Sequence, residues 1–433
     1  MADVETEVAV VGGGIIGCAT AWHLASRGVP VVLLEKGRIA GEQSGRNWGF
    51  VRQQGRDPAE IPLIVESLRQ WRGLAAETGE DLGFHPGGTL YLADDDAHLQ
   101  HLASWLPHAE AHGIDTRLVT REGLPTLLRG SSGRWHGALH TPSDGRAEPT
   151  KAAPALARAA ERRGAQVLTG CAVRGLDVAA GEVRGVVTEQ GRVRARVVVC
   201  AAGAWTSLLL GTVGVRLPQL KVRSSVLRTG PAPRITDGAV WSREVAIRRR
   251  EDGGYTVAHG GRSEHALVPD SFRYFRDFLP LIRASRRGGL GAVRVRPFGR
   301  FAEELAHRRW RPGTTPSPFE TTRVLEPPPN ESTLDAALAN LKRLFPALAD
   351  IRVEQRWAGL IDVTPDAVPV IAPPAALSGL VIATGFSGHG FGIGPGAGRL
   401  AAELALGVRT CVDPTPFRLE RFEDGSARPV AGI

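Results

Sequence analysis

The sequence predicts an α/β chain in which a parallel-sheet domain is interrupted by an α+β domain with an antiparallel sheet. Three observations lead to this prediction. The chain opens with a strand–helix–strand pattern at residues 7–34. Apolar strands of the same kind return at 197–202, 368–371 and 380–383. Residues 217–329 differ, because they combine short β-like runs with Arg-rich and Pro-rich stretches.

The individual elements follow from hydrophobic periodicity. Two buried strands, at 7–11 and 30–34, flank a helix at 15–27. Apolar residues at helical spacing predict further helices at 58–78, 151–163, 333–344 and 398–406. Runs of β-branched and apolar residues predict strands at 88–92, 166–168, 222–227, 245–248 and 255–258, and a hairpin at 183–188 and 191–199.

These elements suggest how the two domains alternate along the chain. The strongest parallel-sheet features lie at both ends and in the middle of the sequence. We therefore expect the parallel-sheet domain to consist of residues 1–85, 146–216 and 346–433. The interrupting domain is expected to consist of residues 86–145 and 217–345.

Composition bounds the class of protein. The chain has 433 residues, 53 basic against 45 acidic side chains, and a formal charge of +8. Lysine occurs at only four positions, so 49 of the basic residues are arginines. An apolar content of 42% excludes a wholly disordered chain. The basic charge raises the question of a nucleic-acid partner, but surface arginine spread over a globular protein explains it equally well.

The ends and the cysteines suggest a location. No apolar run approaches the ~20 residues that span a bilayer, and the acidic start lacks the basic region of a secretory signal. The four cysteines are far apart in sequence. We expect free thiols, no metal site, no membrane span and a cytoplasmic protein.

Residues 12–17 carry the pattern GxGxxG, directly after the first strand and at the start of the helix. Gly12 permits a tight turn, Gly14 lets the backbone approach a pyrophosphate, and Gly17 lets the helix pack on the strand. Glu35 ends the next strand, 18 residues after Gly17, and its carboxylate can accept hydrogen bonds from ribose hydroxyls. This context predicts a Rossmann-like dinucleotide-binding domain and argues against NADP as the ligand.

Four later segments favour FAD over NAD: residues 40–52, 201–205, 359–369 and 383–392. Together, and in this order, they resemble the D-amino-acid oxidase superfamily of flavoproteins, most nearly its sarcosine-oxidase-like, glycine-oxidase-like and amino-acid dehydrogenase members. The resemblance covers nearly the whole chain. It implies FAD bound in an extended form and an enzyme that oxidises the C–N bond of an amino acid or secondary amine. Hydride would pass to flavin N5, and the resulting imine would hydrolyse.

The resemblance also implies which residues contact FAD. Ser44, Arg46 and Asn47 would meet the pyrophosphate or the flavin edge. Val173 would hold the adenine through its backbone, and Asp366 would lie in the motif that bounds the flavin ring. The expected cofactor-binding set is Gly12, Gly14, Ile15, Ile16, Gly17, Glu35, Lys36, Ser44, Arg46, Asn47, Trp48, Val173, Ala202, Gly203, Trp205, Gly359, Asp366, Gly388, His389, Gly390, Phe391 and Gly392.

Residues 385–392 hold four glycines and His389. We expect them to form a loop whose glycines let the backbone approach a flat ring. The loop leads into the helix predicted at 398–406. Backbone N–H groups at that helix N-terminus would stabilise the anionic reduced flavin. We count His389 among the catalytic candidates.

Arg52 is the first candidate for binding a substrate carboxylate, because the matching segment of sarcosine-oxidase-like enzymes carries such an arginine and its planar fork suits the contact. Two anchors of the relatives are missing. Ile361 stands where glycine-oxidase-like enzymes have a carboxylate-binding Arg, and Gly392 where sarcosine-oxidase-like enzymes often have Lys. Arg52 or Arg223 would have to replace them, or the substrate is an amine without that carboxylate.

Two further departures concern the flavin. Gly359 stands where some relatives carry the Cys that attaches FAD, so we expect non-covalent FAD. Thr256, which with Arg52 and His389 makes up the catalytic candidates, stands where monomeric oxidases place the Lys that promotes reaction with oxygen. This favours a dehydrogenase or a slow oxidase, with oxygen or another carrier as electron acceptor.

Two alternatives remain open. One is an FAD-dependent 2-hydroxy-acid dehydrogenase of the same superfamily. The other is a basic tRNA-associated flavoprotein or the flavin subunit of a hetero-oligomer, suggested by the Arg-rich runs at 248–250, 283–296 and 308–311. Aromatic residues are sparse in these runs, so we expect no nucleic-acid partner. The oligomeric state is not predicted.

Overall fold

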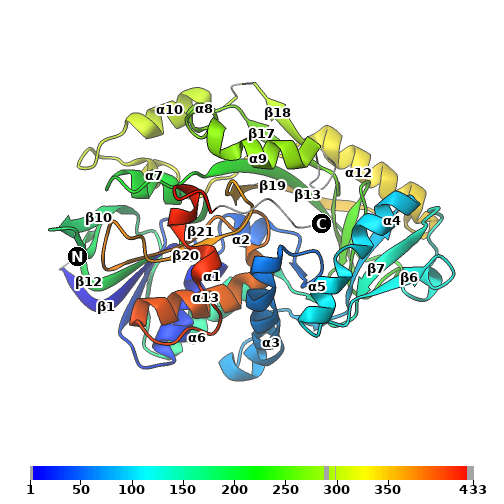
Figure 1. Ribbon diagram of the computed structural model, residues 1–433, viewed down its shortest axis with the longest axis horizontal. Helices are drawn as coiled ribbons and strands as arrows, with labels where there is room; N and C mark the ends of the chain where they lie inside the picture. Colours follow the sequence, from blue (N-terminus) through cyan, green and yellow to red (C-terminus); the bar gives the residue numbers. More distant parts are fainter. Residues whose placement is uncertain (1–2, 287–291, 298, 427–433) are drawn as a thin grey trace.

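In the computed structural model, which describes residues 3–286, 292–297 and 299–426, the chain forms two large sheets and one small one (Figure 1). The first large sheet is centred on β1 (Val4–Val11), which pairs in parallel with β2 and β12. The order β10-β11-β12-β1-β2-β9 is extended by β21, which pairs with the second half of β12, and by β20. Its other strands are β2 (Val31–Leu34), β9 (Gln166–Leu168), β10 (Val173–Ala179), β11 (Glu182–Thr188), β12 (Gly191–Cys200), β20 (Val370–Ala372) and β21 (Leu380–Thr384).

Four helices pack together on one face of this sheet: α1 (Ile15–Ala25), α3 (Ile61–Thr78), α6 (Pro149–Arg162) and α13 (Gly390–Leu406). Contact between α1 and α13 is close because glycines of α13 face α1. A Cβ at Gly398 would lie 2.4 Å from the Cβ of Ala19, and one at Gly394 would lie 2.6 Å from Cγ1 of Ile15. No larger residue fits at these positions without moving a helix.

The second large sheet is mostly antiparallel and is built on β13 (Leu220–Thr229). The strand order is β18-β17-β13-β16-β15-β14-β5-β7-β6, and β19 pairs with β13 along its whole length. Its core is closed by α12 (Glu331–Leu344). The other strands are β5 (Thr89–Ala93), β6 (Arg117–Thr120), β7 (Gly137–Thr141), β14 (Ala239–Trp241), β15 (Ala246–Arg249), β16 (Tyr255–Ala258), β17 (Arg262–Ala266), β18 (Ala292–Arg296) and β19 (Val353–Val363).

A small three-stranded sheet, in the order β3-β8-β4, lies between the two large ones in the chain. Its strands are β3 (Phe50–Val51), β4 (His85–Pro86) and β8 (Gly145–Arg146). The remaining helices are α2 (Gln43–Arg46), α4 (Asp96–Ala103), α5 (Leu106–Ala111), α7 (Thr206–Gly211), α8 (Pro269–Arg273), α9 (Phe275–Arg286), α10 (Phe301–Arg309) and α11 (Pro318–Thr321).

The predicted fold class is confirmed, and the main differences concern boundaries. The helix expected at 398–406 begins at Gly390, so the expected loop ends at His389. The strand expected at 368–371 starts at Val370. β19 falls in the segment assigned to the parallel-sheet domain, yet it pairs with β13 in the other large sheet. That assignment is wrong for this strand, and the other domain boundaries stay predictions.

Several simpler expectations can be compared with the described residues. All four cysteines are free, and Cys18, Cys171 and Cys200 are buried. No described helix combines the length and the apolar character needed to cross a bilayer. In the same residues no group of three or more His, Cys, Asp or Glu side chains is arranged to hold a metal ion. The Arg-rich run at 283–296 lies partly outside the described residues.

A buried ion pair joins the two large parts of the molecule. Arg248 of β15 and Glu148, just before α6, are 0% and 5% exposed. Their two contacts are Nη1–Oε1 at 2.7 Å and Nη2–Oε2 at 3.1 Å. Arg248 also donates Nε to the Trp48 carbonyl at 2.6 Å and Nη2 to Thr256 Oγ1 at 3.0 Å. Burial alone would raise the pKa of Glu148, but Arg248 beside it holds that pKa below its usual value.

We expect Arg248→Met to lower the free energy of unfolding by about 3–5 kcal/mol, because among the described residues the buried Glu148 carboxylate keeps only the Glu251 N–H at 3.0 Å and Arg250 at 3.9 Å. The matched control is Arg343→Met, which removes an exposed pair with Glu244 and should cost less than about 1 kcal/mol. Urea denaturation of both variants at pH 7 checks this. Equal losses in the two variants would contradict it.

Candidate functional site

A long cleft opens at the carboxyl ends of β1, β2 and β12, where doubly wound sheets bind ligands. It is lined by segments that are far apart in sequence but adjacent in the fold. The structure brings to this lining fifteen of the residues predicted to bind a cofactor: Gly12, Gly14, Ile15, Ile16, Glu35, Lys36, Ser44, Asn47, Val173, Ala202, Gly203, Trp205, Gly388, Gly390 and Phe391.

The glycine turn has the geometry that the sequence predicts. Gly12 has φ +109°, and a Cβ there would lie 2.4 Å from the carbonyl oxygen of Ala201. A Cβ at Gly17 would lie 1.9 Å from the Gly12 carbonyl oxygen, so Gly17 acts in packing and lies outside the lining. Gly14 is the N-cap of α1. The first-turn N–H groups of this helix form a site for anionic groups such as a pyrophosphate.

Ser44 closes one side of this helix terminus. Its Oγ accepts a hydrogen bond from the Ile15 N–H at 2.9 Å. Next to it, Gln43 lines the cleft, and its Oε1 is buried without a hydrogen-bond partner among the described residues. A buried acceptor without a donor is costly, so this atom is open to a donor from a ligand in the cleft. Sequence reasoning missed Gln43, although it adjoins Ser44.

Glu35 stands at the end of β2, as predicted. Its two oxygens accept the N–H groups of Gly13 and Gly37, each at 2.7 Å. Burial raises the pKa of this carboxyl, and the two backbone donors oppose that rise. A carboxylate has about four acceptor positions, so two remain for ribose hydroxyls. The residue therefore fits the role of a ribose acceptor.

Glu42 is a cleft residue that the sequence did not reveal. Its carboxylate accepts Lys36 Nζ at 2.7 Å and Trp205 Nε1 at 3.0 Å. Lys36 Nζ also lies 4.1 Å from the ring centroid of Trp205. These contacts fix the predicted residues Lys36 and Trp205 in one cluster that forms a wall of the cleft.

The far end of the cleft is formed by β19 and the start of α13. Asp362 lines it and is buried, which raises the pKa of its carboxyl. The carboxylate accepts the Gly385 N–H at 2.6 Å and Thr384 Oγ1 at 3.0 Å. Because α13 starts at Gly390, its first-turn N–H groups lie directly at the cleft. The helix N-terminus predicted to face the flavin is therefore closer to the cleft than the sequence suggested.

His389, the N-cap of α13, is not itself a lining residue, although Gly388 and Gly390 on either side of it are, and its ring contacts a buried carboxylate. Its Nδ1 is 2.9 Å from Oε2 of Glu60, which is fully buried. Burial lowers the pKa of His389 to about 4, so the ring is neutral at pH 7. Burial alone would raise the pKa of Glu60, but His389 and Arg56 beside it hold that pKa below its usual value. An ionised carboxylate only accepts, so Nδ1 carries the proton and Nε2 remains an acceptor.

Arg56 completes this cluster and was not predicted. It is 2% exposed, and its Nη1 has no hydrogen-bond partner among the described residues. Burial, and then the neighbouring Arg52, lower the pKa of Arg56 to about 10. Arg52 donates to the Gln54 carbonyl, and its guanidinium lies 5.4 Å from the ring centroid of Tyr91. Two cations therefore stand next to His389.

Arg46, Trp48 and Gly359, predicted to bind the cofactor, lie outside the cleft lining. Arg46 donates to the carbonyls of Gly41 and Ala358 and pairs with Glu326. The Trp48 ring packs on Phe50, with centroids 5.7 Å apart. A Cβ at Gly359 would meet the buried Oε1 of Gln43, which leaves no room for a side chain at this position. These residues support the site through their neighbours.

Asp366 and Gly392 are also placed elsewhere. The Asp366 carboxylate is buried and paired with Arg421, Nε–Oδ2 at 2.7 Å, outside the cleft lining. The Gly392 carbonyl accepts Ser67 Oγ at 2.8 Å and Trp71 Nε1 at 2.9 Å. Both residues therefore make their polar contacts with other protein groups, and neither lines the cleft.

Thr256 and Arg223, named as catalytic and substrate-binding candidates, lie in the antiparallel sheet and outside the cleft lining. Thr256 Oγ1 accepts from Arg248 Nη2 and, at 3.4 Å, from Arg250 Nη1. Arg223 is paired with Glu264 and donates to the Pro328 carbonyl at 2.9 Å. The guanidinium of Arg223 is therefore already neutralised.

Comparison with known proteins agrees with this geometry. A model of the DAO family, described as "FAD dependent oxidoreductase", matches residues 7–404. The chain belongs to this family. The resemblance seen in the sequence and FAD as the cofactor are thereby confirmed. The cleft residues fit FAD. The glycine turn leaves room for a pyrophosphate, Glu35 can accept ribose hydroxyls, and the unpaired Gln43 oxygen can accept a further hydrogen bond.

Individual relatives differ in how much of them this chain covers. It is 26% identical to sarcosine oxidase subunit beta of Arthrobacter sp over 97% of this chain and 91% of the relative. Human mitochondrial sarcosine dehydrogenase is 32% identical, but the match covers 51% of this chain and 25% of the relative. Among solved structures, L-amino acid deaminase from Proteus myxofaciens has a TM-score of 0.91 and 32% identity, covering 97% of this chain and 94% of that one.

We expect Gly12→Ala to purify with little or no FAD, because its Cβ would collide with the Ala201 carbonyl and displace the phosphate turn. The control is Gly28→Ala. Gly28 also has a positive φ, +73°, but a Cβ there meets nothing within 4 Å. The ratio of flavin to protein absorbance after gel filtration is the measurement. FAD loss in both variants, or in neither, would contradict the role of Gly12.

The His389 environment predicts acid sensitivity. The pKa of this histidine is about 4 in the folded chain and 6.5 as its reference value. Between these pH values the unfolded chain binds a proton that the folded chain does not, so stability falls as pH falls from 6.5 to 4. Between pH 7 and pH 5 we expect the free energy of unfolding of His389→Gln to fall less than that of the parent chain. The difference is up to about 1.4 kcal/mol per pH unit. Urea midpoints at pH 7 and pH 5 decide this, and parallel losses would contradict it.

Proposed function

We propose that the protein is an FAD-dependent oxidoreductase that oxidises the C–N bond of an amino acid or secondary amine to an imine, which then hydrolyses. FAD supplies the hydride acceptor when bound. The observation that carries the proposal is a cleft continuous from Glu35 to the N-terminus of α13, with two arginines and a neutral histidine next to its far end. The named relatives support the same chemistry, since they include sarcosine dehydrogenase, glycine oxidase and D-amino acid dehydrogenase.

L-α-Amino acids are the first substrate class to test. The two L-amino acid deaminases from Proteus myxofaciens and Proteus vulgaris have TM-scores of 0.91 and 0.90 and identities of 32% and 30%. The same chain also resembles sarcosine oxidase subunit beta over nearly its whole length, so N-methyl amino acids come next. Both classes have an amine on a carbon next to a carboxylate.

Arg52 and Arg56 are the proposed anchors of that carboxylate. A Cβ at Gly392 would lie 3.3 Å from Nη2 of Arg56. Arg56 thus fills the space beside the position where sarcosine-oxidase-like enzymes often carry Lys. Arg52 is half-buried, while Arg223 is held by Glu264, so Arg52 is favoured over Arg223. Nε2 of His389 is left free to accept a proton or hydrogen bond at the same end of the cleft.

The residue at position 256 bears on the electron acceptor. Thr256 replaces the lysine of the fast oxidases, and this supports a dehydrogenase or a slow oxidase. The buried guanidinium of Arg248 donates to the Thr256 hydroxyl. Stopped-flow reoxidation by air that is as fast as in ordinary oxidases would contradict the preference for a dehydrogenase.

The alternatives differ in support. The relatives named sarcosine oxidase subunit beta favour a flavin subunit of a hetero-oligomer as the second candidate. A nucleic-acid role is less supported, because Arg248 in the run at 248–250 is fully buried and Arg308 in another run is paired with Asp270.

The chain also spans only 25% of the sarcosine dehydrogenases and 45% of a 4-methylaminobutanoate oxidase from Paenarthrobacter nicotinovorans, which have further segments.

The test is anaerobic bleaching of the bound flavin by L-amino acids, D-amino acids, N-methyl amino acids and 2-hydroxy acids. We expect a nitrogen compound to reduce the flavin. Arg52→Lys should raise the substrate concentration for half-maximal reduction at least tenfold, because a single ammonium cannot make the bidentate contact. The matched control is Arg409→Lys, at an exposed position. Bleaching by hydroxy acids alone would select the 2-hydroxy-acid alternative.

A further inference from the structure

A second cavity, of about 540 Å³, lies beside the small three-stranded sheet and shares no lining residue with the cleft. Its walls come from β4, β8, the first turn of α6, the segment between β13 and β14, the end of β15 and the loop after that strand. The cavity therefore lies where the parallel-sheet part meets the antiparallel sheet, a common place for ligand sites. The lining residues are His85, Arg146, Lys151, Arg234, Asp237, Arg249, Arg250, Glu251 and Gly253.

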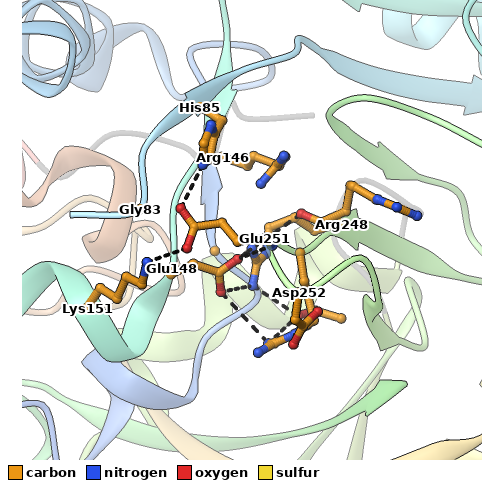
Figure 2. Close-up of polar contacts among 12 residues, drawn as sticks. Gly83, His85, Arg146, Glu148, Lys151, Arg248, Glu251 and Asp252 are labelled. Carbon is orange, nitrogen blue, oxygen red and sulfur yellow. Dashed lines mark hydrogen bonds and ion pairs between the residues drawn. The ribbon is translucent and has the colours of Figure 1, made fainter. Parts of the chain in front are cut away.

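The lining has five permanent cations against two carboxylates. Three of the cations are neutralised by acids. Lys151 Nζ lies 2.5 Å from Glu251, Arg250 Nε lies 3.0 Å from Asp252, and Arg234 pairs with Asp237. Figure 2 shows Lys151 and His85 directed at the same carboxylate, that of Glu251, which lies 2.7 Å from His85 Nε2.

Arg146 and Arg249 have no such acid. Within the described part of the chain neither forms an ion pair. Arg146 donates Nε to the Asp237 carbonyl at 3.1 Å, and its Nη1 is buried without a hydrogen-bond partner. Arg249 donates to the Ala232 carbonyl at 3.0 Å and to the Tyr255 hydroxyl at 3.1 Å. Burial, followed by the nearby Arg248, lowers the pKa of Arg146, and the carboxylates of Glu148 and Glu251 oppose that fall.

Two guanidinium groups without acids in one cavity are matched by a ligand that carries two negative charges. Guanidinium forks bind carboxylate and phosphate oxygens in pairs. We propose that this cavity binds a small oxyanion with at least two negative charges, a di- or polyphosphate group or a dicarboxylate, held between Arg146 and Arg249. The site is separate from the cleft and does not depend on which substrate the enzyme oxidises.

The cavity also touches the buried ion pair. The Glu251 N–H donates to Oε1 of Glu148 at 3.0 Å, and Arg250 contacts Thr256 Oγ1. Glu148 in turn holds Arg248, which donates to the Trp48 carbonyl. A bound anion would therefore stabilise the loop that carries Glu251 against both sheets.

The test is calorimetric titration of the FAD-loaded protein with inorganic pyrophosphate, malonate and acetate. We expect pyrophosphate or malonate to bind at least tenfold more tightly than acetate, and more weakly as salt rises. Tight binding of pyrophosphate alone identifies a phosphate ligand, and of malonate alone a dicarboxylate. Failure of both dianions to bind would overturn the proposal.

Variants locate the binding. Arg146→Gln and Arg249→Gln should each weaken it tenfold or more, whereas Arg409→Gln, at an exposed position, should not. If Arg146→Gln does not fold with FAD, Arg146→Lys replaces it, because the lysine keeps the charge but loses the fork. Binding that survives both cavity variants would place the anion elsewhere and contradict the proposal.

Discussion

The contact between Glu148 and Arg248 is the constraint on which the arrangement of the two sheets depends. Burying a guanidinium is tolerable only when its donors are satisfied. Here every N–H of Arg248 has a partner, drawn from Glu148, Trp48, Arg249 and Thr256. Gly49 makes room for it, since a Cβ there would lie 2.5 Å from Arg248 Nε. The ion pair thus sets where the segment around Trp48, the start of α6 and the antiparallel sheet meet.

Much of the cofactor-binding half could be predicted because its signals are local. The turn at Gly12, the helix that follows and the acid at Glu35 occur within one strand–helix–strand unit, and each has a steric or hydrogen-bonding reason that a short sequence reveals. The fold class and the family follow from such units in the right order. The structure places these residues where the pattern predicts them.

What the sequence could not show depends on distant contacts. Arg56 and Gly392 are 336 positions apart in the chain, and nothing local indicates that one fills the space beside the other. Asp366 has the appearance of a site residue until its partner Arg421 is seen. The glycines after His389 suggested a loop, because glycine disfavours helix, but close packing against α1 overrides that preference. The short helices α4 and α5 were missed because few of their residues are buried.

The glycine face of α13 has a consequence for the cofactor that goes beyond packing. Ile15, the first residue of α1, touches Gly394 near the start of α13, so the two helix starts are fixed relative to each other. One start faces the phosphate end of the cleft and the other its far end. The packing of α1 on α13 therefore fixes the distance between the two ends of the cleft. A substitution that moved either helix would therefore change the positions of both ends of the cleft relative to each other.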